Sequence, residues 1–542
     1  MHLRSFIPSF LIAAFASAAE RDRRRLAELR ANWGKEISRP RNMDAVSLYH
    51  TSAAAGLTTV DDRTWQDLGM DDLFAKIDRT AGTPGQQMLY HQMRTYQADD
   101  RILAERARQQ AVFKDDPVLR EKCQALLSRL GGSGGEWLGS MLLNPFPANP
   151  RFAPLLYLCS FLGAACILGI AYIHLLFLPA LAMMFINVAI TANYGRHIRP
   201  YFTGFSQIVT MLGVGVELAA VPNPHALPQL DTLRKSKPLA ARLRNRLGWL
   251  VMDRTRMSDL TQLAVDYINM FFLFDIVVYL RSNAALRQHK IELVGMWEAI
   301  GSLDASIAVA SYLQGVPGLI RPTLTAERRL AVEGLSHPLL ADPVSNSLSL
   351  DGRSALIAGP NMAGKTAFIR TVGINVILGQ TLNLCLAEKA VLPRAVVRSA
   401  IRREDNLEAG QSYFFAEIQQ ILEFTRTDEG GPRHLSLIDE IFRGTNTVER
   451  IAASAAVLHH LGRHQMVLAT THDVELQELV ADTFDMHHFS DQIVEGRYIF
   501  DYHLHPGPAR SRNAIRLLEI TGYPSEIIRE AETLAARNSA KR

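Results

Sequence analysis

Gly359-Pro360-Asn361-Met362-Ala363-Gly364-Lys365-Thr366 decides the fold of this chain, because the stretch is a complete G-x-x-x-x-G-K-T sequence. Apolar residues precede it at 354–358, and the residues after Thr366 have helical character. We therefore predict a buried strand, a loop whose glycines let backbone N–H groups surround phosphates, and a helix whose N-terminus favours an anion. Lys365 would contact the β- and γ-phosphates of a nucleoside triphosphate, and the Thr366 hydroxyl would bind Mg²⁺.

Two further apolar segments each end in polar residues that suit phosphate chemistry. The first, 434–438, leads into Asp439 and Glu440, a pair in which the first carboxylate holds Mg²⁺ through water and the second orients the attacking water. The second, 465–469, leads into Thr470-Thr471-His472-Asp473, where His472 would sense the γ-phosphate. A lone acidic pair is more often a turn, and a lone histidine a capping residue. Their order behind a phosphate loop instead favours an ATPase.

Six segments of the chain resemble the MutS family of ATPases rather than transporters or helicases. These segments are 359–366, 439–447, 470–472, 408–417, 334–338 and 522–528. Two positions depart from the family pattern, since Ala363 and Phe442 stand where glycines are usual. Neither departure removes a ligand of the nucleotide.

The resemblance implies roles that the residues alone do not. Ser412 would reach the nucleotide bound to the opposite subunit, which predicts a homodimer, although by itself Ser412 is better read as a helix N-cap. Tyr502 is a candidate for stacking on adenine. The expected cofactors are ATP and Mg²⁺, with Lys365, Glu440 and His472 acting in hydrolysis.

The expected fold class is an α/β P-loop ATPase domain of the ABC type, preceded by an all-α lever domain that carries a transmembrane helical hairpin. Weaker similarity at 61–85 marks the start of the lever domain, and 268–275 and 292–312 its returning helices. The expected divisions are a hydrophobic segment at 1–20, lever residues at 21–150, the hairpin at 151–195, returning helices at 196–325 and the ATPase domain at 326–542. A mismatch-reading domain is not expected, because the one Phe-x-Glu triplet, 415–417, lies in the ATPase signature and leaves no aromatic wedge.

The apolar region from 152 to 192 is long enough for two membrane helices, over 152–173 and 175–192. Neither contains a charged residue. Arg151 before the pair and Arg196 and Arg199 after it place both ends in the cytoplasm. The alternative is a buried helical pair in a large soluble core. The apolar stretch 271–280, by contrast, carries Asp275 and is read as a core helix of the lever domain.

The first nineteen residues resemble a secretory signal, but the arginines at 21 and 23–25 oppose export. An uncleaved anchor, an interfacial helix or a mis-called start codon would each explain them. The four cysteines have no metal-binding spacing and are expected to be reduced thiols. We therefore expect a protein of the cytoplasmic membrane with its ATPase and lever domains in the cytoplasm.

Two classes of function fit the sequence. In the first, the protein is a membrane-tethered, DNA-binding ATPase of the repair or recombination type. In the second, the hairpin has replaced DNA, and the ATPase drives a conformational switch at the membrane. The net charge of +4 is too small to argue for nucleic acid by itself.

Overall fold

The computed structural model describes residues 20, 23–131, 135–144, 146, 148–247, 267–268, 270–360, 362–401, 413–426, 431–442, 446–494, 497–509 and 522–540. The chain forms two compact units. The first contains the described residues of 1–56, 75–92 and 105–316, and the second those of 57–74, 93–104 and 317–542. The segment predicted at 1–20 lies outside the described residues except for its last residue.

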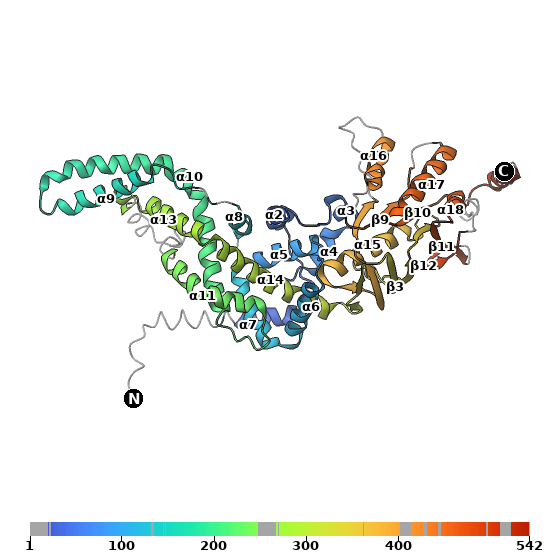
Figure 1. The fold of residues 1–542 in the computed structure, drawn as a ribbon, viewed down its shortest axis with the longest axis horizontal. Helices are drawn as coiled ribbons and strands as arrows, with labels where there is room; N and C mark the ends of the chain where they lie inside the picture. Colours follow the sequence, from blue (N-terminus) through green and yellow to red (C-terminus); the bar gives the residue numbers. More distant parts are fainter. Residues whose placement is uncertain are drawn as a thin grey trace. The chain divides into compact units, whose positions relative to one another are not determined.

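The first unit is helical, as the sequence predicts (Figure 1). Its helices, some of which share residues with the second unit, are α2 (Met43–Ala53), α4 (Met70–Ile77), α5 (Thr83–Arg94), α6 (Asp100–Asp115), α7 (Pro117–Leu127), η1 (Ser128–Leu130), α8 (Leu138–Leu143), α9 (Ala153–Gly169), η2 (His174–Leu176), α10 (Phe177–Leu218), α11 (Pro228–Leu247), α13 (Phe274–Gln288) and α14 (Lys290–Gly315). Helix α14 is apolar almost all round and lies in the core, where Trp297, Leu303 and Ile307 are fully buried.

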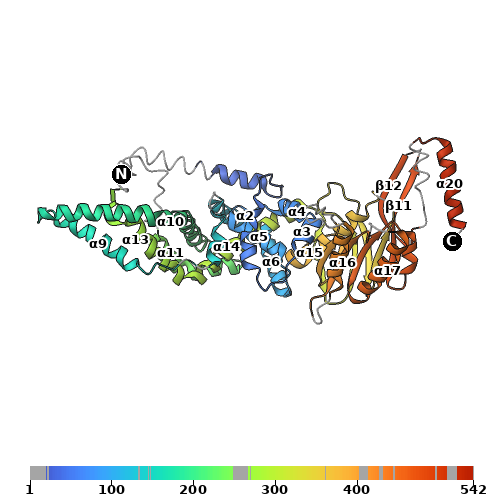
Figure 2. The ribbon, with the colours of Figure 1, turned by 90° about the horizontal axis from the view of Figure 1, so that it is seen from above.

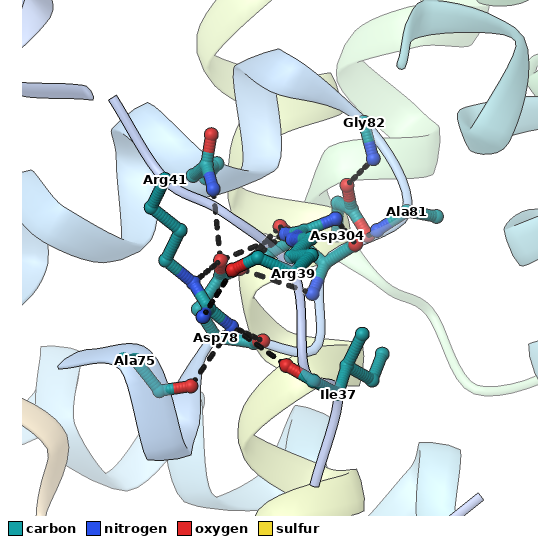
Figure 3. Close-up of polar contacts among 10 residues, drawn as sticks. Ile37, Arg39, Arg41, Ala75, Asp78, Ala81, Gly82 and Asp304 are labelled. Carbon is teal, nitrogen blue, oxygen red and sulfur yellow. Dashed lines mark hydrogen bonds and ion pairs between the residues drawn. The ribbon is translucent and has the colours of Figure 1, made fainter. Parts of the chain in front are cut away.

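A buried polar cluster joins three segments of this unit (Figure 3). The Asp78 carboxylate accepts hydrogen bonds from Arg39 at 2.7 Å and Arg41 at 2.8 Å. On α14, Asp304 accepts the backbone N–H groups of Ala81 at 2.9 Å and Gly82 at 2.8 Å, just before α5 begins. Burial raises the pKa of the Asp304 carboxyl to about 7, although the two N–H donors act in the opposite direction. These contacts fix the start of α5 on the core helix.

Helix α9 and the first part of α10 lie side by side in both views (Figures 1 and 2). Large apolar side chains on these helices and on η2 between them face outward: Leu168 of α9 is 72% exposed, Leu175 of η2 77% and Phe185 of α10 63%. In the most apolar window of residues 174–195 only 11% of the residues are buried, which is low for a helix in the core of a soluble protein. The predicted second span, 175–192, falls within the apolar segment 174–195, and the helix continues beyond it to Leu218.

The apolar stretch 271–280 is not the single core helix that the sequence suggests. Leu273 has a left-handed φ of 47°, and α13 begins only after it. The preceding carbonyl groups are bound by the hairpin: Asn187 Nδ2 donates to Phe271 O at 2.7 Å and Ser160 Oγ to Phe272 O at 2.5 Å. The polar residues of the two apolar helices thus satisfy a break in the neighbouring backbone.

The second unit is built on a six-stranded sheet in the order β12-β11-β5-β10-β9-β8. The strands are β12 (Arg497–Pro506), β11 (Phe484–Val494), β5 (Ser354–Ala358), β10 (Met466–Thr471), β9 (His434–Asp439) and β8 (Val396–Ala400). All neighbours pair in parallel except β11 and β12. The three apolar segments predicted as strands are therefore confirmed as β5, β9 and β10. Their carboxyl ends lie at one edge of the sheet, the usual place for a ligand in such folds.

Two smaller sheets and several helices complete the unit. The sheets are β2-β7-β3-β4 and β1-β6, formed by β1 (Leu319–Ile320), β2 (Thr323–Thr325), β3 (Arg329–Leu335), β4 (Asn346–Asp351), β6 (Cys385–Leu386) and β7 (Lys389–Pro393). The helices are α3 (Asp62–Asp67), α15 (Lys365–Leu382), α16 (Tyr413–Thr425), α17 (Thr447–His464), α18 (Val474–Leu479) and α20 (Ser525–Ala540).

The edge strand β8 is protected by side chains from the amino-terminal part of the chain. Its outward N–H groups at Val397, Ser399 and Ile401 donate to Tyr96 OH, Thr64 Oγ1 and Asp67 Oδ2 at 3.0–3.1 Å. These contacts explain why 57–74 and 93–104 belong to the second unit. The predicted domain division differs from the structure here, and also at its boundary, since the second unit resumes at residue 317 instead of 326.

Candidate functional site

The phosphate loop, residues 359–366, joins the carboxyl end of β5 to the N-terminus of α15. Gly359 has a φ of 144°, and a Cβ there would lie 2.6 Å from the carbonyl oxygen of Phe489. Gly364 has a φ of 103°, and a Cβ there would lie 3.3 Å from the Tyr502 ring. Both positions thus require glycine. Met362 is exposed with a φ of 71°, whereas Asn361 lies outside the described residues.

The Lys365 side chain is only 4% exposed and folds back along the loop. Its Nζ donates to the carbonyl oxygens of Gly359 at 2.6 Å and Pro360 at 2.9 Å. Burial lowers the pKa of the ammonium to about 8, and the Asp439 carboxylate opposes this change. A buried cation held mainly by neutral carbonyl groups is well suited to exchange them for anionic oxygens.

Asp439, at the end of β9, is held by hydroxyl groups from two other elements. Thr366 Oγ1 on α15 donates to Asp439 Oδ2 at 3.0 Å, and Thr470 Oγ1 on β10 donates to Asp439 Oδ1 at 2.6 Å. The oxygen atoms of Thr366 and Asp439, the predicted Mg²⁺ ligands, therefore lie next to each other. Oxygen donors of this kind are the ones that Mg²⁺ prefers.

Glu440 follows in a left-handed conformation, with a φ of 56°, and its side chain is 7% exposed. Its Oε1 lies 3.8 Å from Lys365 Nζ, and its Oε2 lies 3.4 Å from His472 Nδ1. The carboxylate is thus placed between an ammonium and an imidazole. Beyond His472, Asp473 accepts a hydrogen bond from Arg450 at 2.8 Å, which fixes the end of this loop.

A cavity of about 330 Å³ lies over these groups. It is lined by Pro360, Met362, Gly364, Lys365, Thr366, Ala367, Asp439 and Glu440. Predicted residues from the ends of β5 and β9 therefore line one cavity. His472, from the end of β10, lies against Glu440. Ala363, which replaces a glycine of the family pattern, is buried beneath the loop.

A second cavity, also of about 330 Å³, shares Met362, Gly364 and Ala367 with the first. Its other lining residues are Leu335, His337, Leu340, Asp342, Pro343, Val344, Asn346, Phe368, Thr371, Phe489 and Tyr502. Tyr502 is half-exposed with a φ of 55°, and its carbonyl oxygen accepts a hydrogen bond from Asn346 Nδ2 at 3.0 Å. An aromatic, mostly apolar space beside a phosphate loop has the character of a base-binding site.

Sequence reasoning did not find every residue of the site. Thr470 belongs to a run that the sequence marks, but the sequence predicts no role for its hydroxyl. The sequence also predicts no function for Asn346, Arg450 or Glu417. Thr470 stands in the quoted run before His472, so its hydroxyl was a detectable signal, whereas the other three act through contacts distant in sequence. Ser412, the predicted trans-acting residue, lies outside the described residues.

Comparison with known proteins agrees with this geometry. Residues 355–538 match the family model described as MutS domain V. The DNA mismatch repair protein MutS of Chloroflexus aurantiacus is 31% identical over 277 residues, which cover 48% of this chain and 28% of that protein. The DNA mismatch repair protein MSH3 of Coccidioides immitis is 32% identical over 45% of this chain and 23% of its own length.

The MutS protein of Streptococcus sanguinis is 29% identical, again over 48% of this chain, and the match covers 32% of its length. The chain thus matches a third or less of each of these relatives. The residues that match the family model include the phosphate loop and lie in the second unit. The second unit thus contains a domain that matches MutS domain V, and about half of the chain is similar to MutS proteins.

Proposed function

We propose that this protein binds ATP and hydrolyses it to ADP and phosphate with Mg²⁺, and that it does so as a homodimer tethered to the cytoplasmic membrane. The observation that carries the proposal is the convergence of Lys365, Thr366, Asp439 and Glu440 on one cavity. MutS proteins are ATPases, which agrees with it. The second cavity would take the base, with Tyr502 stacking on adenine.

Each side chain of the site has a physical task in this reaction. Lys365 exchanges the loop carbonyls for phosphate oxygens, and the N-terminus of α15 adds favourable charge. Thr366 and Asp439 would hold Mg²⁺, which when bound neutralises phosphate charge. Glu440 orients a water molecule towards the γ-phosphate, and His472 beside it senses whether that phosphate is present.

Two substitutions separate binding from turnover. Glu440→Gln keeps the phosphate cradle, so we expect unchanged ATP affinity and a loss of turnover of about 100-fold or more. Lys365→Ala removes the charge that contacts the phosphates, so we expect affinity to fall by roughly 10- to 100-fold. Glu449→Gln, at an exposed carboxylate on α17, is the control and should change neither quantity. Parental turnover in Glu440→Gln would show that the assignment of Glu440 is wrong.

The homodimer follows from the family resemblance of Ser412. ATP should tighten the dimer, and mixing Ser412→Ala subunits with Lys365→Ala subunits should leave at most one competent site in each mixed dimer. Light scattering with and without ATP measures the first effect. A fully active protein that stays monomeric in every nucleotide state would exclude the trans-acting role.

The tether is supported by the outward-facing apolar side chains of α9 and α10. Monomeric soluble proteins rarely expose so large an apolar surface, whereas lipid accommodates it without cost. The arginines that flank the hairpin in the sequence favour a cytoplasmic position for both of its ends.

We further propose that the helical unit binds DNA, as the names of the relatives suggest. Helix α11 supports this, because Lys235, Lys237, Arg242 and Arg246 are exposed along it. The alternative is a membrane-bound nucleotide switch that does not bind DNA, which the exposed hairpin favours. Titration of detergent-solubilised protein with duplex, branched and single-stranded DNA at several salt concentrations decides between them. Affinity that falls with salt supports DNA binding, and no affinity at low salt supports the switch.

A further inference from the structure

We propose that Glu417 on α16 is a positioning residue for ATP hydrolysis, because its carboxylate holds the turn that directs Glu440 into the phosphate cavity. The inference rests on the proposed function, since it concerns the geometry of the water-orienting carboxylate. Its central observation is a hydrogen bond of 2.6 Å from the backbone N–H of Phe442 to Glu417 Oε1.

The turn after β9 is under backbone strain. Glu440 and Phe442 have φ angles of 56° and 59°, in the left-handed region that residues other than glycine seldom adopt. Such a conformation is strained and persists only where its surroundings impose it. The Glu440 side chain can reach the cavity only while this turn is maintained.

Three side chains from three elements impose that conformation. Thr470 Oγ1 accepts the N–H of Glu440 at 3.2 Å, and Ser454 Oγ donates to the carbonyl oxygen of Ile441 at 3.4 Å. Glu417 accepts the N–H of Phe442, so it closes the turn at its far end. It makes the shortest of the three contacts, and a carboxylate is the strongest acceptor among them.

Helix α16 is itself anchored to the sheet edge. Gln420 Nε2 donates to the carbonyl oxygen of Ser399 on β8 at 3.1 Å, and Arg63 of α3 donates to Gln420 Oε1 at 2.6 Å. Helix α16 therefore connects the edge of the sheet to the turn that carries Glu440.

The test is a set of substitutions that separates the effect of the length of the side chain at position 417 from the effect of its negative charge. Glu417→Gln keeps an acceptor oxygen at the same distance, so turnover should stay within about threefold of the parent. Glu417→Asp keeps the charge but withdraws the oxygen, so turnover should fall about 10- to 100-fold, because small misplacements of a reacting group cost this much. ATP affinity should change by less than about twofold in both variants. Glu423→Ala, at an exposed carboxylate on the same helix, is the control.

The outcomes separate this inference from the proposed function. If the parent protein hydrolyses ATP and Glu417→Asp does so equally well, Glu417 has no positioning role, although the ATPase assignment stands. If Glu417→Gln loses activity while Glu417→Asp keeps it, charge rather than reach matters, and the inference is wrong. If ATP affinity falls together with turnover, Glu417 supports the site only structurally. A parent that binds ATP without hydrolysing it would refute the proposed function itself.

Discussion

The hairpin and the nucleotide cavity reverse the usual distribution of side chains in opposite ways. In the hairpin, apolar residues such as Leu175 and Phe185 face outward. In the cavity, the charged residues Lys365 and Glu440 are almost completely buried. Both arrangements are costly in water unless a partner is present, so each marks a place where the protein meets something else. In the function proposed above, that partner is lipid for the hairpin and a phosphate anion for the cavity.

A second contrast shows why composition alone cannot identify a membrane-spanning helix. Residues 174–195 and helix α14 are both long and apolar enough to cross a bilayer. The first is 11% buried, however, and the second 78%. Helix α14 is apolar because it forms the core of the helical unit, where Asp304 has backbone partners. Both helices pass the test of length and composition, and their exposure separates them clearly.

The largest expected effect is on membrane association. Replacing residues 153–195 with a short Gly-Ser linker should move nearly all of the protein into the soluble fraction, because each buried Leu or Phe contributes about 1.5–3 kcal/mol to insertion. ATP turnover should change by no more than about twofold, since no residue of the site is altered. Fractionation followed by an ATPase assay measures both quantities.

Deletion of residues 1–20 is the control for this experiment, and the protein should then stay in the membrane fraction. Reporter fusions should read cytoplasmic at Ser133 and Gly204 and external near His174, because a hairpin returns the chain to its starting side. Release of the protein by deletion of 1–20 alone would place the anchor in those residues and remove the membrane assignment of the hairpin.

A smaller effect is expected from the buried charge in the cavity. Lys365 has a pKa of about 8 in the folded protein, below its ordinary value of 10.5. Phosphate binding requires the ammonium, so ATP affinity should be constant below pH 8 and fall up to about tenfold per pH unit above it. Over the same window the unfolded chain binds the extra proton, so the stability of the nucleotide-free protein should rise with pH. Calorimetric titrations at several pH values measure the affinity, and Lys365→Met should lack the break near pH 8.

The smallest effect concerns the other buried charge, Asp304 on α14. Its folded pKa of about 7 is above the ordinary 3.8, so the folded state holds a proton that the unfolded state releases. The contribution of Asp304 to the free energy of unfolding should therefore be largest below pH 4 and decline as the pH rises towards 7. Asp304→Asn should remove that decline. It should also lower the free energy of unfolding by about 1 kcal/mol at low pH, because the amide N–H₂ would face an N–H donor.

Denaturant unfolding at pH 5 and pH 8, followed by tryptophan fluorescence, tests both statements. Identical pH dependence in the two proteins would mean that Asp304 stays ionised.

Much of the nucleotide site was determined by local sequence. A short apolar run bounded by glycines predicts a buried strand, and the spacing of Gly359, Gly364 and Lys365 predicts a loop that holds phosphates. The apolar strands before Asp439 and His472 were equally clear, because parallel strands buried on both faces consist of nearly continuous apolar residues. The two apolar helices at 153–195 followed from length and lack of charge, although their exposure did not. These features depend on neighbours along the chain, and so the sequence was sufficient for them.

Only the tertiary structure decided the rest, because the remaining features depend on contacts between distant segments. No local pattern shows that Thr64 and Asp67 bind the N–H groups of β8, or that Glu417 closes the turn after Glu440. The break at Leu273 is stabilised by Asn187 and Ser160, far earlier in the chain. Hydrogen bonds of this kind satisfy backbone groups only once the fold has brought both partners together. Local sequence patterns therefore identified the strands, the loop and the two apolar helices. Contacts between distant segments determined what holds them in place.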